Sequence, residues 1–115
     1  MKQKIFITGG TGCIGHYVIE EALTTFHEAE LHLLCRDSTR LRKDLKDHPS
    51  IHCHKGSMET IEDLKPILQT MEALIHIATP WGDEEETVNI NVNQAIMIFI
   101  KLNYFNFFIF KFITI

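Results

Sequence analysis

The chain has 115 residues, of which 45% are hydrophobic, and its formal net charge is −4. That length allows one domain at most, and the absence of a basic stripe argues against nucleic acid as a partner. Cys13, Cys35 and Cys53 form no C-x-x-C pair, which is typical of reduced thiols and predicts a cytoplasmic protein. The first residues run directly into an apolar pattern, so we expect no signal peptide.

The N-terminal segment combines an apolar run with a glycine-rich turn. Residues 3–8 predict a buried parallel strand, and a helical pattern follows over residues 13–26. Gly9 allows a tight turn, Gly12 lets an anion approach the backbone, and Gly15 lets the helix pack against the strand. The free N–H groups of the first helical turn predict a phosphate site. The alternative is a turn that binds nothing.

The spacing Thr-Gly-x-x-Gly-x-x-Gly, from Thr8 to Gly15, resembles the extended short-chain dehydrogenase/reductase superfamily of the NAD-dependent epimerase/dehydratase type. The resemblance covers roughly residues 3–97. It implies an α/β fold, a truncated Rossmann-type doubly wound parallel sheet of about four to five strands, with strand order 3-2-1-4 and perhaps a fifth. It also implies a nicotinamide dinucleotide cofactor, cradled by Gly9, Thr11, Gly12, Cys13, Ile14 and Gly15.

Residues 31–35 predict the second strand, and its end bears on the choice of cofactor. An NAD site places an acidic residue there to hold the ribose 2′-hydroxyl. By the resemblance, Cys35 occupies that position and Arg36 follows, so a guanidinium can pair with a 2′-phosphate. Arg40 adds nearby positive charge. We therefore expect NADP, with NAD as the alternative.

A short helix is predicted over residues 39–46, packing through Leu41 and Leu45 with Arg42 and Lys43 on its solvated face. Residues 51–55 predict the third strand.

His52 and His54 share one face of this strand. No further ligand pair has zinc-like spacing, so a polar or edge-facing pair is favoured over a metal site. At the following corner, the family has Gly-Asp-Leu and its Asp contacts the adenine end of the cofactor. Here Ser57 and Met58 follow the glycine, so one hydrogen bond remains and the acidic contact is lost.

A further helix is predicted over residues 59–71, with Thr60 as its N-cap. Pro66 leaves two alternatives, a kinked long helix or a short one that starts at Asp63. The apolar positions at helical spacing are Ile61, Leu64, Leu68 and Met71.

Residues 73–79 predict the fourth strand, and its end resembles the family strand that precedes the active site. We expect His76 to be a core histidine hydrogen-bonded inside the sheet. The resemblance places the nicotinamide half of the cofactor over Ile77, Ala78 and Thr79. In the next loop, Trp81 either stacks on a substrate or folds back on the domain. A helix is expected from Glu84, with Asn91 as a structural polar residue.

The family continues with a catalytic Ser or Thr and a Tyr-x-x-x-Lys motif, in which the tyrosine transfers a proton. Tyr17 and Tyr104 are followed four residues later by Glu21 and Phe108, so no catalytic residue is assigned. The resemblance implies oxidoreduction or epimerisation of a nucleotide sugar or a similar carbonyl or alcohol substrate. We expect this chain to be catalytically incomplete. The alternatives are a non-catalytic, redox-sensing NADP-binding module and a gene fragment without independent function.

Residues 1–101 therefore predict a partial NAD(P)-binding domain, and residues 102–115 an atypical tail rich in Phe, Ile, Asn and Lys. These are residues of A/T-rich codons, and we hypothesise a lost or shortened reading frame. Polar residues interrupt the tail well short of about 18 apolar residues, so we expect no membrane anchor. A strand over residues 105–113 would fill the fifth position and expose an apolar edge for self-association.

Overall fold

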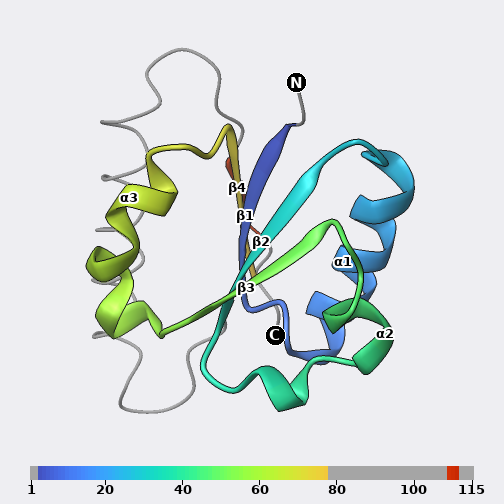
Figure 1. Cartoon of the computed structure of the whole chain (residues 1–115), viewed down its shortest axis with the longest axis horizontal. Coiled ribbons are helices and arrows are strands. Elements are labelled where there is room, and N and C mark those ends of the chain that lie inside the picture. Colours follow the sequence, from blue (N-terminus) through green and yellow to red (C-terminus); the bar gives the residue numbers. More distant parts are fainter. Residues whose placement is uncertain (1–2, 78–108, 112–115) are drawn as a thin grey trace.

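The computed structural model describes residues 3–77 and 109–111 (Figure 1). The chain alternates strands with helices, which is the order that produces a parallel α/β sheet. Two 3-10 helices, Ser38–Arg40 and Met58–Leu64, accompany the main elements. The main elements are β1 (Lys4–Thr8), α1 (Cys13–Thr25), β2 (Glu30–Cys35), α2 (Lys43–Lys46), β3 (Ile51–Lys55), α3 (Lys65–Leu68), β4 (Ala73–His76) and β5 (Ile109–Lys111).

The five strands form one sheet in the order β3-β2-β1-β4-β5, and every pairing is parallel. The α/β fold and the order 3-2-1-4 are therefore confirmed. β1 lies at the centre, where Ile5 pairs with Leu31 of β2 and with Ala73 of β4. Its side chains enter core clusters on both faces of the sheet, which accounts for its unbroken apolar run. β5 pairs with β4 and falls inside the predicted range 105–113.

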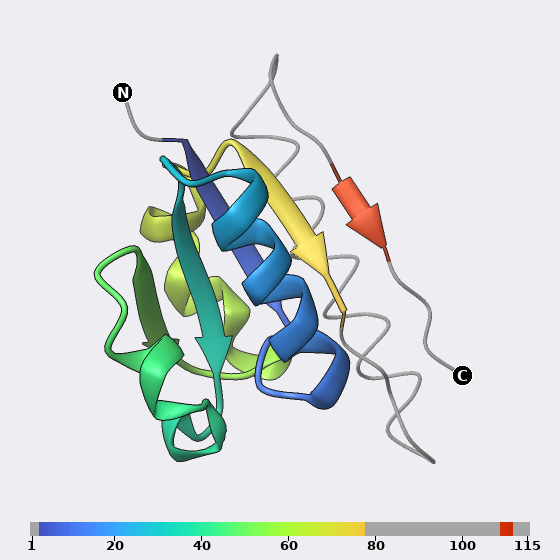
Figure 2. The same cartoon turned by 90° about the vertical axis from the view of Figure 1, so that its right-hand side faces the viewer.

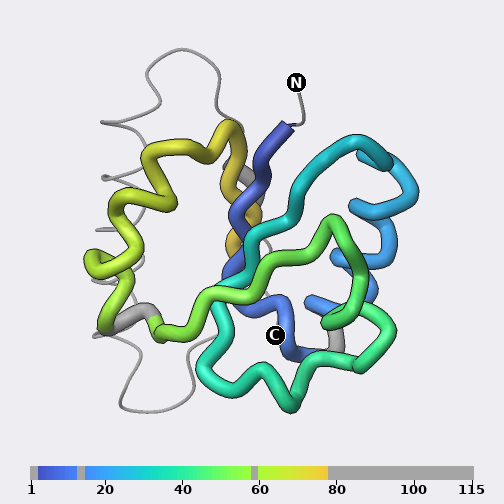
Figure 3. The backbone as a smooth tube through the Cα atoms, in the orientation of Figure 1, coloured from blue at the N-terminus to red at the C-terminus, as the bar shows by residue number. Residues whose placement is uncertain are grey.

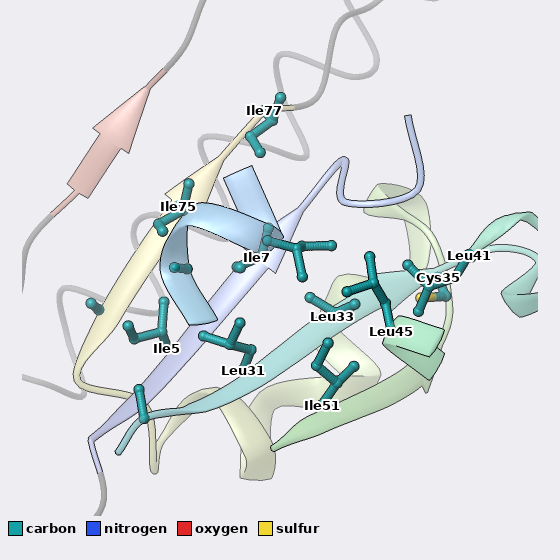
Figure 4. Close-up of a cluster of buried hydrophobic side chains, with 14 residues drawn as sticks. Ile5, Ile7, Leu31, Leu33, Cys35, Leu41, Leu45, Ile51, Ile75 and Ile77 are labelled. Atoms are coloured by element: carbon teal, nitrogen blue, oxygen red, sulfur yellow. The ribbon is translucent and has the colours of Figure 1, made fainter. Parts of the chain in front are cut away.

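Helices cover both faces of the sheet (Figures 1 and 2). Side chains alternate along β1, so Ile5 and Ile7 join one core cluster while Phe6 joins another. The first cluster fills the layer between the sheet and α1 and α2 (Figure 4). The second lies towards α3 and contains Phe6, Leu34, Ile61, Leu68, Met71 and Leu74.

The prediction of one continuous helix over residues 39–46 is wrong. Leu41 and Arg42 have extended backbone, with ψ angles of 133° and 137°, and they separate the Ser38–Arg40 turn from α2. The backbone N–H of Arg42 donates to Nε2 of His16 at 3.2 Å, so a tertiary partner replaces a helical one. Leu41 and Leu45 are buried as expected.

The predicted helix over residues 59–71 is also divided. A 3-10 segment with a kink at Thr60 comes first, and α3 begins only at Lys65, with Pro66 in its first turn. Proline costs little there because those N–H groups have no helical acceptor. Ser57, not Thr60, is the N-cap, and its N–H donates to Thr60 Oγ1 at 3.0 Å. The short-helix alternative is the closer of the two, although the start at Asp63 is two residues early.

Among the residues that the structure describes, no helix has the length and apolar character needed to cross a membrane.

Candidate functional site

The chain leaves β1 through the glycine-rich turn and enters α1 directly, as Figure 3 traces. Gly9 has a φ of 73°, a left-handed conformation that side chains rarely adopt, so the predicted tight turn is present. The N–H of Gly12 points back to the carbonyl of Gly9 at 3.4 Å. α1 then starts at Cys13 with Gly12 as its N-cap.

Gly12 and Gly15 differ in what the protein itself requires of them. A Cβ on Gly15 would lie 2.6 Å from two backbone carbons of Gly10 and closer still to the carbonyl oxygen of Gly9. This glycine therefore packs the helix against the turn, and not against the strand as predicted. A Cβ on Gly12 would meet only the Gly9 oxygen, at an ordinary 3.7 Å. Among the described residues, nothing near Gly12 requires the absence of a side chain.

The start of α1 provides an electropositive end. The helix is 13 residues long and has no acidic residue in its first turn. Its first N–H groups have no acceptor within the helix, and its dipole favours an anion at this end. Thr11 lies partly buried in the turn, and Cys13 and Ile14 are the first two residues of the helix. The six residues predicted to cradle a pyrophosphate thus lie in one turn and one helix start.

A pocket of about 280 Å³ lies where β2 and β3 end, and Arg36 is one of its lining residues. β2 and β3 are parallel, and Cys35 stands opposite Lys55, so both strand ends meet at this edge. Lys55 adds a second positive charge that sequence reasoning missed, although the predicted strand pairing would have placed it there. Arg40 is exposed and is not part of the lining. The lining residues are Cys35, Arg36, Asp37, Ser38, Cys53 and Lys55.

Asp37, the one carboxylate among the described lining residues, already has partners. Oδ1 of Asp37 accepts hydrogen bonds from the backbone N–H of Thr39 at 3.0 Å and from its hydroxyl at 2.6 Å. These hydrogen bonds hold the pKa of Asp37 below its ordinary value, so it stays ionised as a cap for the next turn. Asp37 therefore starts the following segment.

Cys35 carries no charge at the end of β2. It is 2% exposed, and burial, with a contribution from Cys53, raises the pKa of its thiol to about 12. By the family resemblance, this neutral thiol stands where an NAD site would place a carboxylate. Cys53 is exposed at the same edge.

The remaining predicted residues lie at the ends of β3 and β4. Ser57 caps the 3-10 helix that Met58 begins. Ile77 is buried, and its N–H donates to the carbonyl of Thr8 at 3.1 Å. Ala78 and Thr79 lie outside the described residues, as do Trp81 and Asn91.

His76 is a core histidine, as expected. It is 3% exposed and hydrogen-bonds through Nδ1 to the hydroxyl of Thr8, its partner on β1.

Three comparisons place this geometry among known proteins. An oxidoreductase, AgnL4, of Paecilomyces divaricatus is 29% identical over 76 residues, which are 64% of this chain and 29% of that protein. A dTDP-glucose 4,6-dehydratase from Bacillus anthracis, solved with NAD, has a TM-score of 0.77 at 17% identity, covering 95% of this chain and 36% of its own. A short-chain dehydrogenase/reductase from Veillonella parvula, solved with NADP, has a TM-score of 0.60 at 21% identity, covering 84% of this chain and 44% of its own.

This chain spans less than half the length of each of these three proteins. The two structural similarities agree with the parallel α/β fold described above. The sequence pattern of the NAD dependent epimerase/dehydratase family matches residues 5–101. The chain belongs to the NAD dependent epimerase/dehydratase family.

Proposed function

We propose that this chain binds a nicotinamide dinucleotide with its pyrophosphate over the glycine turn. The observation that carries the proposal is the contrast between Gly15, which the fold itself requires, and Gly12, which has room for a side chain. A ligand that lies directly against the backbone would explain why residue 12 has no side chain. The bare start of α1 supplies N–H donors and a positive dipole for the same group.

Within this proposal, the adenosine ribose lies in the pocket at the ends of β2 and β3. Arg36 and Lys55 supply two positive charges there, and Cys35 is uncharged. A ribose 2′-phosphate fits such a pocket better than a bare hydroxyl does, because a guanidinium binds phosphate through two parallel hydrogen bonds. NADP is therefore the proposed cofactor and NAD the alternative. By family resemblance, Arg40 contributes charge, Ser57 and Met58 border the adenine, and Ile77, Ala78 and Thr79 border the nicotinamide.

Calorimetry on the full chain with NADPH and NADH tests the cofactor and its preference. We expect saturable binding that is tighter for NADPH. Arg36→Gln should weaken NADPH binding by about tenfold or more and leave NADH nearly unchanged, since only one cofactor carries the 2′-phosphate. Lys43→Gln is the matched control, because Lys43 is exposed on α2 and outside the pocket lining. Equal losses in both variants would mean that general charge, and not Arg36, selects the cofactor.

The reaction that we propose follows from the family. It is oxidoreduction or epimerisation at a carbonyl or alcohol carbon, with a nucleotide sugar or a similar compound as substrate. The sequence contains no Tyr-x-x-x-Lys, and the chain spans 29% of the length of its oxidoreductase relative. We therefore propose that the 115-residue chain does not catalyse the reaction by itself. Hydride transfer by the purified chain, followed by nicotinamide absorbance with candidate sugars, would overturn this point.

Two other functions remain as alternatives, a cofactor-binding module that acts through a partner and a gene fragment. The pocket at the ends of β2 and β3 supports the module. Thermal unfolding with each cofactor distinguishes the two, because a module is stabilised saturably and a fragment does not respond. The DNA downstream of the coding region tests the fragment directly: a frame that restores Tyr-x-x-x-Lys would favour it. A cytoplasmic location, the boundary at residue 101 and self-association through the tail remain predictions.

A further inference from the structure

Three histidines and a glutamate gather on the sheet face opposite α1. Glu30 and His32 alternate along β2, His52 and His54 alternate along β3, and His32 pairs with His52 in the strand register. The ring of His54 stacks on Phe6, a residue of the core cluster beneath α3. The alternate strand positions hold Cys35, Cys53 and Lys55 of the candidate cofactor pocket. Their side chains therefore project from the opposite face of the sheet.

The four side chains contact one another closely. The His32 ring stacks on His52 and on His54, with centroids 4.7 and 5.1 Å apart. Its Nδ1 lies 2.8 Å from Nε2 of His54, and its Nε2 lies 3.5 Å from Oε2 of Glu30. One ligand atom from each of Glu30, His32 and His52 lies within 4.8 Å of the other two. The side chains of His32 and Glu30 are 12% and 25% exposed, so the cluster is partly shielded from water.

The hydrogen bond between His32 and His54 allows two proton arrangements. In one, Nδ1–H of His32 donates to His54, and the lone pair on Nε2 of His32 then faces the Glu30 carboxylate. Two acceptors oppose each other in that arrangement, and a cation between them would remove the repulsion. In the other, Nε2–H of His32 donates to Glu30, which suits the ion-free protein. Metal-bound histidines usually have the first arrangement, with the distal N–H donated to a fixed acceptor.

We propose that Glu30, His32 and His52 bind a divalent transition-metal ion of the zinc class, with His54 orienting the His32 ring. Two imidazoles and one carboxylate form a donor set found in zinc sites that keep a fourth position for water. Imidazole nitrogen also suits nickel and copper, whereas magnesium and calcium prefer oxygen ligands. This site is distinct from the cofactor site and does not depend on the proposed function.

The geometry needs only a small adjustment to hold the ion. Zinc lies about 2.0–2.2 Å from nitrogen and oxygen ligands, so two ligand atoms of one tetrahedral ion are about 3.5 Å apart. The three ligand atoms here lie within 4.8 Å of one another. His52 is exposed on β3, the last strand on its side of the sheet, so its ring can rotate towards Glu30 without displacing buried atoms.

Calorimetry and thermal unfolding of the full, tag-free chain with zinc chloride test the site, after treatment with a chelator. We expect one saturable zinc site and a higher unfolding temperature. His52→Gln should weaken binding by about tenfold or more, and Glu30→Gln should weaken it in the same direction. His27→Gln is the matched control, because His27 is exposed in the loop after α1 and lies outside the cluster. Magnesium chloride at the same concentration should give no response.

Cysteine thiols also bind zinc, so Cys53→Ser is tested in parallel. Binding that survives Cys53→Ser and is lost in His52→Gln supports the histidine cluster. Binding that is lost in Cys53→Ser, or is kept in both His52→Gln and Glu30→Gln, overturns the proposal, as does an absence of saturable zinc binding. Circular dichroism of His52→Gln excludes misfolding as the cause of a loss, and this exposed edge position is expected to tolerate the change.

Discussion

Alanine substitutions at Gly12 and Gly15 should separate what the fold needs from what a ligand needs. In Gly15→Ala, the new methyl lies 2.6 Å from backbone carbons of Gly10, about 1 Å inside normal contact between carbons. Backbone cannot move aside as a side chain can, so we take about 3 kcal/mol for the overpacking. Alanine regains about 1 kcal/mol through its helix propensity. The net loss of stability is about 2 kcal/mol, or roughly 10 °C in the melting temperature.

Gly12→Ala should behave differently. The φ and ψ of Gly12, −78° and 176°, are allowed for alanine, and the nearest atom to its Cβ is 3.7 Å away. A gain of about 0.4–1 kcal/mol from the unfolded chain offsets the weaker capping by alanine, so stability changes by less than about 0.5 kcal/mol. The methyl would, however, occupy the space proposed for the pyrophosphate. NADPH affinity should therefore fall by at least about tenfold.

Urea denaturation reports the stability of both variants, and calorimetry with NADPH reports binding by Gly12→Ala. Stability of Gly15→Ala equal to that of the parent chain would refute the close approach of α1 to the turn. Unchanged NADPH affinity in Gly12→Ala would refute the pyrophosphate placement. A stability loss in Gly12→Ala as large as that in Gly15→Ala would refute the distinction between the two glycines.

Three further predictions concern the core, the thiols and the surface. Phe6→Ala should cost about 3–5 kcal/mol in urea denaturation, because Phe6 is fully buried between strands and helices; a cost below about 1 kcal/mol would contradict that packing. The high pKa of the buried Cys35 thiol should keep it unalkylated by iodoacetamide from about pH 7 to 9 while the exposed Cys53 is labelled, and peptide mass spectrometry that finds equal labelling would disprove this. Arg42→Ala should leave the melting temperature nearly unchanged despite the ion pair of Arg42 with Glu20, because water screens the attraction between two exposed groups, and a clear drop in thermal unfolding would contradict this.

The sequence predicted β1, α1 and the glycine turn well because local signals decide them. An apolar run, three spaced glycines and a helical repeat lie within one short segment, and each indicates the same structure. The region from Ser38 to Lys46 was less predictable. Leu41 and Leu45 have helical spacing and are both buried, yet the helix is interrupted because the Arg42 N–H bonds to His16, far away in the chain. No local sequence pattern predicts such a hydrogen-bond partner.

The histidine cluster shows the same limit at the level of a site. His52 and His54 are visible as a pair on one strand, but two ligands do not make a metal site. The other two members, Glu30 and His32, come from β2 and meet them only through the parallel register. Lys55 in the pocket beside Arg36 was missed for the same reason, because it comes from a neighbouring strand. Spacing along the chain reveals ligands on one element, whereas ligands on neighbouring strands require the pairing to be known first.

His16 joins the two regions that the proposed cofactor would span. Its Nδ1–H donates to the carbonyl of Gly12 at 2.7 Å, and its Nε2 accepts the N–H of Arg42 at 3.2 Å. One imidazole ring thus sets the distance between the anion-binding turn and the segment that follows Arg36. An engineer who wishes to exchange residues 36–42 for those of an NAD-specific relative must keep this ring and its acceptor geometry, or the two halves of the site will lose their alignment.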